Sequence, residues 1–221
     1  MIGLVTLGHA PRLDHEKVYE KIAPGVPRKL VGALDTLSCD EARKLEDKKG
    51  LSPLVCLLSD KTTVEIPLPA LFPYIENQLS ILANEGAHLA VVLCCGGFPD
   101  FDVSIQVLLP GVILPALVKA TCPKGRIGII VPNQAQESAA VEHWEKSGIK
   151  VTSAVVSPYE GRGFIEAGKK VRNIHADLVA IDCMGFEDED RQKLRELCNC
   201  PVLLPKTLVA RVALEINESS M

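Results

Sequence analysis

The chain has 221 residues, a formal net charge of −4 and 47% hydrophobic residues, of which few are aromatic. This length is enough for one large domain or for two small ones with cores of their own. The weak negative charge excludes the basic surface typical of nucleic-acid binding, and the absence of any run of 18 apolar residues excludes an obvious membrane span. The first residues lack the basic segment and cleavage site of a signal peptide, so we expect a cytoplasmic protein.

In the first half, apolar runs alternate with amphipathic stretches. The pattern predicts, in chain order, a strand at 2–8, a helix at 13–23, a strand at 28–35 and a helix at 38–46. Two apolar runs around Ser59-Asp60-Lys61 predict a β-hairpin at 54–68. A helix at 69–86 and a buried strand at 88–95 follow.

The second half alternates more regularly. Residues 110–122 predict a helix, or a strand and then a helix, interrupted at Pro115. Beyond them the pattern predicts strands at 126–132, 150–158, 177–186 and 201–205. The helices predicted between and after these strands lie at 134–148, 163–176, 187–199 and 206–217. Such strand–helix alternation favours parallel sheets with helices on both faces.

Two segments of the chain repeat each other. "AHLAVVLCCG" (87–96) aligns with "ADLVAIDCMG" (176–185), which pairs Cys94 with Cys183 and Gly96 with Gly185. The first strand of each half also matches, "IGLVTLG" against "IGIIVPN" at 127–133, and the hairpin at 54–68 is the natural candidate for the extra length of the first half.

The repeat predicts an α/β fold of two similar three-layer α/β/α lobes, each with a mainly parallel sheet. We expect the lobes to be related by a pseudo-twofold axis with a cleft between them. The first lobe is predicted at 1–118 and the second at 119–205, and the helix at 206–217 is a candidate to pack back on the first lobe. Ligands of such sheets bind outside the carboxyl ends of the strands.

Cys94 and Cys183 each stand at the carboxyl end of a buried strand. Two thiols on opposite faces of one carbon can remove a proton on one side and return it on the other, which is cofactor-independent racemisation. A thiol with a pKa of about 8.5 acts as a base only where loop N–H groups or a helix N-terminus lower that value. The alternative is that both residues are small core hydrophobes, as buried cysteines often are.

Glycines and polar residues near these strand ends are candidates to bind a substrate anion. They are Gly8, His9, Gly96, Gly97, Asn133 and Gly185. Glycine lets the backbone approach a ligand closely and direct its N–H groups at an anion. His9 is either an anion ligand or a surface histidine. Asp182 sits either behind the sheet as a capping acceptor or near the Cys183 thiol, where it would raise the thiol pKa.

The other cysteines have plainer interpretations. We take Cys39, Cys56, Cys122, Cys198 and Cys200 as packing residues, and strand alternation turns Cys95 away from Cys94. The even number of cysteines does not indicate disulfides in a chain without a secretion signal. No C-x-x-C or H-x-x-x-H pair is present, so we expect no metal site.

Six segments together resemble the AroM family. They are "IGLVTLG", "LCCGGFPDF" (93–101), "LPGVILPALV" (109–118), "RIGIIVPNQAQ" (126–136), "DCMGF" (182–186) and "PVLLPKTLVARVALE" (201–215). That family is similar to the aspartate/glutamate/hydantoin racemase-like superfamily, whose relatives include arylmalonate decarboxylase and maleate isomerase. The resemblance implies two α/β lobes with the active site between them and one catalytic cysteine from each, at Cys94 and Cys183. It also implies independence from pyridoxal phosphate and metal, so we expect no cofactor.

The chain departs from the racemases beside both cysteines. The racemases usually follow the first cysteine with Asn-Thr and the second with Thr-Glu, whereas Cys95-Gly96 and Met184-Gly185 stand here. Those side chains help to hold an amino-acid substrate, so the resemblance does not extend to amino-acid racemisation.

Three functions remain open from the sequence. The leading one is a racemase- or isomerase-like enzyme in which Cys94 and Cys183 transfer protons to and from a small carboxylate-bearing molecule. The second is a decarboxylase or cis–trans isomerase that uses one cysteine. The third is a protein that binds a small anion without turnover. The expected partner is this small molecule, with no nucleic acid and no membrane, and a homodimer is compatible with the apolar strand edges and C-terminal helix.

Overall fold

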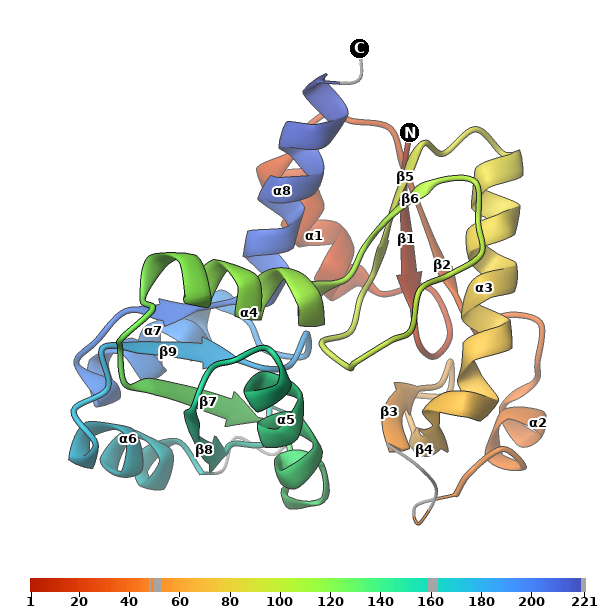
Figure 1. The fold of residues 1–221 in the computed structure, drawn as a ribbon. Helices are drawn as coiled ribbons and strands as arrows, with labels where there is room; N and C mark the ends of the chain where they lie inside the picture. Colours follow the sequence, from red (N-terminus) through yellow and green to blue (C-terminus); the bar gives the residue numbers. More distant parts are fainter. Residues whose placement is uncertain (48, 50–52, 159–162, 220–221) are drawn as a thin grey trace. The chain divides into compact units, whose positions relative to one another are not determined.

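The computed structural model describes residues 1–47, 49, 53–158 and 163–219 (Figure 1). They divide into two compact units, each of which is an α/β structure with a parallel sheet. The first consists of Met1–Cys94, Phe98–Pro110 and Val209–Met221, and the second of Cys95–Gly97 and Gly111–Leu208. No helix in the described part of the chain has both the length and the apolar character needed to cross a bilayer.

The sheet of the first unit is wholly parallel. Its strands, in spatial order, are β2 (Arg28–Gly32), β1 (Ile2–Thr6), β5 (Leu89–Val92) and β6 (Gln106–Leu108). An antiparallel hairpin of β3 (Pro53–Leu57) and β4 (Thr63–Pro67) stands apart from this sheet. The helices of the unit are α1 (Leu13–Ile22), α2 (Cys39–Arg43), α3 (Leu68–Asn84) and most of α8 (Pro205–Ser219).

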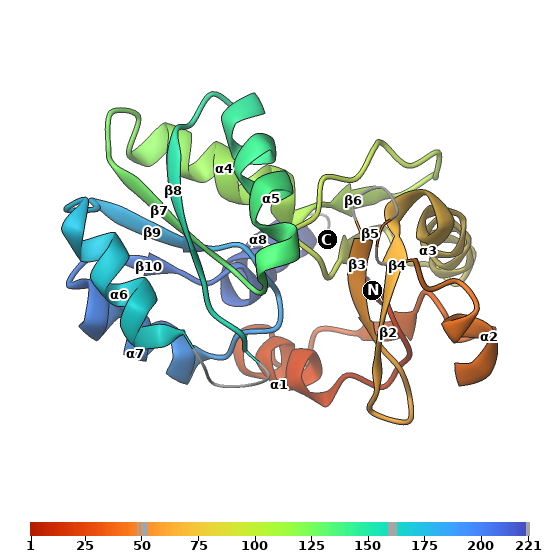
Figure 2. The same cartoon turned by 90° about the horizontal axis from the view of Figure 1, so that it is seen from below.

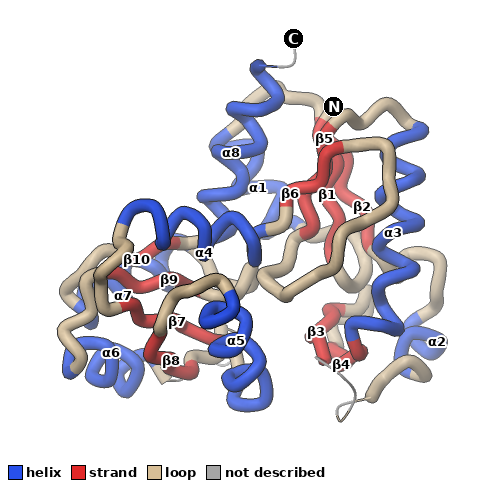
Figure 3. Tube along the Cα trace, in the orientation of Figure 1, coloured by secondary structure: helices blue, strands red, loops and turns tan. Residues whose placement is uncertain are grey.

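One face of this sheet packs on α3. The helix turns four fully buried side chains to the sheet at helical spacing, namely Leu71, Ile75, Leu79 and Leu82. They share a core with Val5, Ala90 and Val92, which point to the same face of their strands. Figure 3 shows α1 and the C-terminal part of α8 on the opposite side of the strands from α3, which completes three layers in this unit.

The second unit repeats this plan. Its sheet has the order β10 (Val202–Leu203), β9 (Leu178–Ile181), β7 (Ile127–Val131) and β8 (Val151–Val155), again all parallel. Apart from the first residues of α8, the helices of this unit lie in pairs on the two faces of the sheet (Figure 2). They are α4 (Pro110–Thr121) with α5 (Gln134–Lys146), and α6 (Phe164–Asn173) with α7 (Asp188–Cys198). Trp144 of α5 is fully buried in the core under the first pair.

The internal repeat is present in the strand pairing itself. In the first unit Ile2 of β1 pairs with Leu89 of β5, and in the second Ile127 of β7 pairs with Leu178 of β9. These are the residues that the sequence repeat aligned, so both sheets have the same register. The predicted fold of two similar α/β lobes with mainly parallel sheets is confirmed.

The structure corrects several details of the predicted elements. The strands predicted at 88–95 and 177–186 end at Val92 and Ile181, so both cysteines lie in loops. The strand predicted at 28–35 ends at Gly32, and the short edge strand β6 was not predicted at all. β6 has only three residues, and such a length carries no readable alternation.

Packing against α3 predicts a contrast between two neighbouring positions of that helix. Leu79 is fully buried, whereas Ile81 is 37% exposed. We expect Leu79→Ala to lower the free energy of unfolding by about 2–5 kcal/mol, because it leaves a cavity in the core. Ile81→Ala, the matched control, should lower it by less than about 1 kcal/mol. Urea denaturation measures both, and equal losses would contradict the assignment of the core face.

Candidate active site

The predicted site residues stand at equivalent strand ends of the two units. Gly8 and His9 follow β1, and Cys94 follows the neighbouring β5. In the second unit Asn133 follows β7, and Cys183 follows its neighbour β9. Because parallel strands end at the same edge of a sheet, each unit brings its cysteine and its polar candidate to one carboxyl edge.

Cys94 lies where the backbone turns away from the sheet. The N–H of Leu93 still donates to the carbonyl of Val5 at 2.8 Å, and the N–H of Cys94 then donates back to Val92 at 2.8 Å, which makes a three-residue turn. The side chain is half-buried and packs against the core shared with α3. Burial, together with the nearby Cys94, raises the pKa of the Cys56 thiol far above its usual range. Cys56 therefore stays neutral and places no charge beside Cys94.

Cys183 lies at the equivalent point of the second unit. The N–H of Asp182 donates to the carbonyl of Ile130 at 2.8 Å, as that of Leu93 does to Val5. The half-buried Cys183 packs against the core under α6 and α7. The backbone N–H of Gly185 donates to its sulfur at 3.3 Å. A donor directed at sulfur favours the thiolate over the thiol.

The loop that contains Gly185 is held at its far end by an ion pair between a buried lysine and a half-exposed glutamate. The fully buried Lys206 donates to the Glu187 carboxylate at 2.6 Å. Glu187 is also the N-cap of α7 and forms a capping box with Asp190. The turn from Cys183 to Glu187 is thereby fixed at both ends.

Gly8 is a close-packing position. A Cβ atom at Gly8 would lie 1.9 Å from the carbonyl oxygen of Leu57, a backbone atom of β3. The N–H of the next residue, His9, donates to that same oxygen at 2.9 Å. The hairpin β3–β4 therefore lies directly against the end of β1.

His9 also bonds to the hairpin. The N–H of Ser59 donates to its Nδ1 at 3.0 Å, so Nε2 carries the ring hydrogen and donates to the carbonyl of Leu37, also at 3.0 Å. The residue is only 6% exposed. Both ring nitrogens are engaged, so an anion could reach His9 only after one of these bonds opens. Its assignment to substrate binding stays a prediction.

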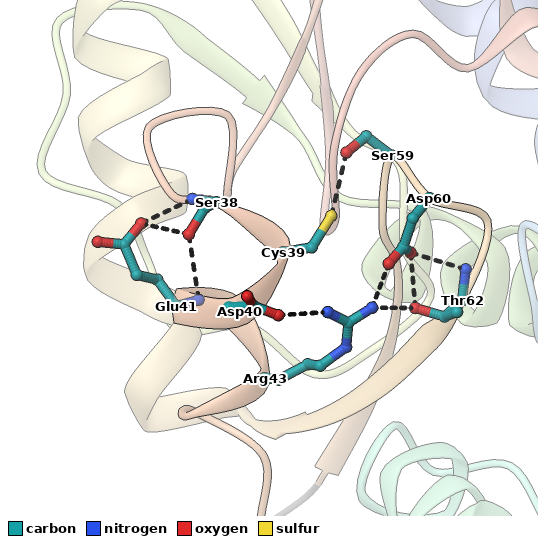
Figure 4. Close-up of polar contacts among 8 residues, drawn as sticks. All are labelled: Ser38, Cys39, Asp40, Glu41, Arg43, Ser59, Asp60 and Thr62. Carbon is teal, nitrogen blue, oxygen red and sulfur yellow. Dashed lines mark hydrogen bonds and ion pairs between the residues drawn. The ribbon is translucent and has the colours of Figure 1, made fainter.

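Further polar contacts join α2 to the turn of the hairpin (Figure 4). The Arg43 guanidinium bonds to Asp40 and Asp60, and to the hydroxyl of Thr62 at 3.1 Å. Hydrogen bonds from Thr62, and then Arg43, lower the pKa of Asp60 to about 2. The thiol of Cys39 lies 3.2 Å from the Ser59 hydroxyl. Cys39 is therefore part of this structural network.

Gly96 and Gly97 follow Cys94 and pack within the second unit. A Cβ on Gly97 would lie 3.0 Å from Nδ1 of His143, a residue of α5. His143 was not identified from the sequence, where it appears only as one polar position of a helix. The structure places it beside the predicted anion-binding loop.

Asp182 points away from its neighbour Cys183. Its place in the strand alternation turns it to the face covered by α4 and α5, where Trp144 and His143 lie near it. Burial raises the pKa of Asp182 from 3.8 to about 6, and those two neighbours oppose the rise. Of the two placements left open by the sequence, the one behind the sheet is the one observed.

Asn133 is the N-cap of α5. Its Oδ1 accepts the N–H of Gln136 at 2.9 Å, so its amide nitrogen is the group left to donate to an anion. Its contact with a substrate, like those of the glycines, stays a prediction. Among the described residues no cluster of three or more His, Cys, Asp or Glu side chains could hold a metal.

The contact between Gly8 and β3 predicts a large cost for a single methyl group. Gly8→Ala must displace backbone of the hairpin, so we expect a loss of about 1–3 kcal/mol in the free energy of unfolding. Gly3→Ala is the matched control in the same unit, because its Cβ would meet side-chain atoms of Leu82 at 2.8 Å and Ala90 at 3.3 Å and no backbone atom as close. Urea denaturation measures the free energy of unfolding. The alkylation rate of the buried Cys56 in β3 should rise if the hairpin is displaced. Unchanged Cys56 reactivity in Gly8→Ala would rule out the displacement.

The raised pKa of Asp182 predicts an unusual pH dependence of stability. Between about pH 4 and 6 the folded protein keeps a proton that the unfolded chain has lost, so this group makes stability fall as pH rises. Asp182→Asn removes the effect. We expect its stability relative to wild type to increase by about 1.4 kcal/mol per pH unit across that window. Denaturation series on both proteins measure the difference, and parallel pH profiles would refute it.

Solved structures with the same fold are racemases, isomerases and a decarboxylase. Arylmalonate decarboxylase superposes with a TM-score of 0.63 at 10% identity, covering 96% of this chain and 91% of its own. The maleate isomerase Iso from Pseudomonas putida S16 has a TM-score of 0.61 at 9% identity, covering 98% and 92%. The aspartate racemase of Picrophilus torridus has a TM-score of 0.58 at 12% identity, covering 99% and 94%. At these identities the likeness establishes the racemase-like fold.

Among proteins with curated descriptions, none matches this chain. The sequence does match the family described as AroM protein, over residues 2–217. This match spans both units and includes the loops of Cys94 and Cys183. The chain therefore belongs to the AroM family.

Proposed function

We propose that the protein is a cofactor-independent racemase- or isomerase-like enzyme that acts on a small carboxylate-bearing molecule. Cys94 and Cys183 are the acid and base. The observation that carries the proposal is their equivalence: each thiol stands just beyond the strand that pairs, in the same register, with the first strand of its sheet. Cysteines that served only as core packing have no reason to occupy the carboxyl edge in both units.

The reaction is a proton exchange at the carbon next to the carboxylate. One thiolate removes the proton, the negative charge passes into the carboxylate, and the other thiol returns a proton to the carbon. A C–H bond is broken in the first step and a C–H bond is formed in the second, so the reaction needs no oxidant or reductant. General acid–base catalysis of this type contributes about 10²–10⁴-fold to a rate.

A local contact supports ionisation of Cys183, and no charge of Cys56 opposes that of Cys94. Cys183 accepts the Gly185 N–H, and the neutral Cys56 adds no charge near Cys94. Asp182 faces α5, and so does not place its carboxylate where it would raise the pKa of Cys183. The N–H groups of Gly96 and Gly97 are our candidates to bind the substrate carboxylate.

A second candidate function uses a single thiol. The solved relatives include an enzyme described as arylmalonate decarboxylase as well as racemases and an isomerase, so the fold is compatible with more than one outcome at the protonated carbon. In this version one of the two cysteines alone protonates the substrate, and Cys183 is a candidate because its sulfur accepts the N–H of Gly185. Dependence of the reaction on one cysteine or on both separates the two candidates.

Solvent deuterium exchange tests the proposal. A panel of small 2-substituted carboxylic acids is incubated with the protein in D₂O, and incorporation at the carbon next to the carboxylate is followed by NMR. We expect incorporation with at least one compound, and a loss of about 10²-fold or more in Cys94→Ser and in Cys183→Ser. Cys200→Ser, at the amino edge of the second sheet, should retain the wild-type rate.

The remaining outcomes discriminate among the functions. Loss in only one of the two variants, with decarboxylation or cis–trans isomerisation of a panel compound, favours the single-thiol enzyme. Alkylation of Cys94 and Cys183 no faster than that of free cysteine, together with no exchange, contradicts both enzyme proposals and leaves the anion-binding protein.

A further inference from the structure

His143 of α5 donates a hydrogen bond to a backbone carbonyl of α4 that has no donor within its own helix. In an α-helix the carbonyl of Gly111 would accept the N–H of residue 115, but residue 115 is proline and has none. Nε2 of His143 lies 2.7 Å from this carbonyl oxygen and donates to it. The bond joins α5 to the first turn of α4 and fixes the ring orientation. It also places the hydrogen of a neutral ring on Nε2, which leaves Nδ1 as a lone pair.

The other side of the ring faces the loop that follows Cys94. A Cβ on Gly97 would lie 3.0 Å from Nδ1 of His143 and 3.4 Å from its Cε1. Those distances are tight for a methyl group, so the backbone at Gly97 passes directly over the ring edge. Gly97 is not one of the glycines with a positive φ, so it is the limited space beside His143 that favours glycine here.

Gly111 holds the same loop from a second side. A Cβ on Gly111 would lie 2.4 Å from the carbonyl oxygen of Cys95 and 2.7 Å from that of Gly96. The carbonyls of Cys95 and Gly96 therefore lie directly against the first turn of α4. His143 and Gly111, joined by one hydrogen bond, together form the support of the loop Cys95–Gly97.

His143 also lies near the strand end that carries the second cysteine. It lies near enough to the carboxyl of Asp182, the residue before Cys183, to oppose the rise in its pKa that burial causes. One side chain thus adjoins both the segment that follows Cys94 and the segment that precedes Cys183. All of these contacts are within the second unit.

We propose that His143 is a positioning residue of the site. Anchored on the carbonyl that Pro115 leaves open, its ring holds the loop Cys95–Gly97 in the form in which the loop N–H groups bind the carboxylate of a substrate beside Cys94. The inference rests on the proposed function for the identity of the substrate group. It adds to that function the residue that sets the geometry of the carboxylate site.

Two alkylating reagents of matched chemistry test this role without turnover. Iodoacetate carries a carboxylate and iodoacetamide does not, and both alkylate a thiolate. The rate of each reagent at Cys94 is measured by peptide mass spectrometry, and the ratio of the two rates is compared with that of free cysteine. In the wild type we expect the ratio to exceed that of free cysteine by on the order of tenfold, the contribution of one charge-assisted hydrogen bond.

Substitutions at His143 should lower this ratio selectively. We expect His143→Leu to bring it close to the free-cysteine value while the iodoacetamide rate changes little. His143→Gln, whose amide can still donate to Gly111, should retain a larger part of the preference. An unchanged ratio in His143→Leu overturns the proposal.

A double variant separates positioning from simple hydrogen-bond satisfaction. In Pro115→Ala with His143→Leu, the N–H of the new alanine can donate to the Gly111 carbonyl within the helix. We expect this change to recover the thermal stability lost in His143→Leu but not the preference for iodoacetate. Recovery of both would mean that His143 only satisfies a carbonyl. Pro115→Ala alone is the control.

The test is independent of deuterium exchange. If no compound exchanges deuterium but the ratio drops in His143→Leu as expected, the result supports the carboxylate site and contradicts the proton-transfer function. If the wild-type ratio equals that of free cysteine, the loop does not bind carboxylates and the inference falls, whatever the exchange experiment gives.

Discussion

Parallel strand pairing in one register is the constraint on which the site depends. In the first sheet Ile2 of β1 pairs with Leu89 of β5, and in the second Ile127 of β7 pairs with Leu178 of β9, so within each sheet the two central strands begin side by side. Because the strands are parallel, their carboxyl ends then fall at one edge, and the residues that follow must turn out of the sheet there. Cys94 and Cys183 are those residues. A shift of one residue in either register would turn its cysteine to the opposite face.

Each unit surrounds the carboxyl edge of its own sheet with different segments. In the first, the β3–β4 hairpin presses on Gly8 and bonds to Nδ1 of the His9 ring, while Nε2 of the ring donates to Leu37, so this histidine links three segments of its own unit. In the second, no hairpin is inserted between the described strands β8 and β9, and Asn133 at the equivalent position caps a helix. The repeat therefore preserves the thiols and varies what surrounds them.

Polar and charged side chains flank the loop of the second cysteine on both sides. Asp182 lies on one side of the strand end and faces α5, and Lys206 holds Glu187 at the far end of the loop. Burying such groups costs stability unless each has a partner. Their place around Cys183 and the loop Cys95–Gly97 is consistent with polar groups that set the geometry of a site, and His143 extends this arrangement to α4 through the carbonyl of Gly111.

The sequence alone determined the alternation of strands and helices, the repeat and the choice of Cys94 and Cys183, because periodicity and repeated segments are local in the chain. It predicted neither the end of β5 at Val92 nor the three-residue strand β6, since both depend on pairing with distant strands. Only the tertiary structure decided what surrounds each candidate. His9 bonds to a hairpin 50 residues away, and His143 finds its role through Gly111, 32 residues away. From the sequence Pro115 was only an interruption of the segment 110–122, and the packing of α5 on α4 decided that His143 would donate to the carbonyl that this proline leaves without a helical donor.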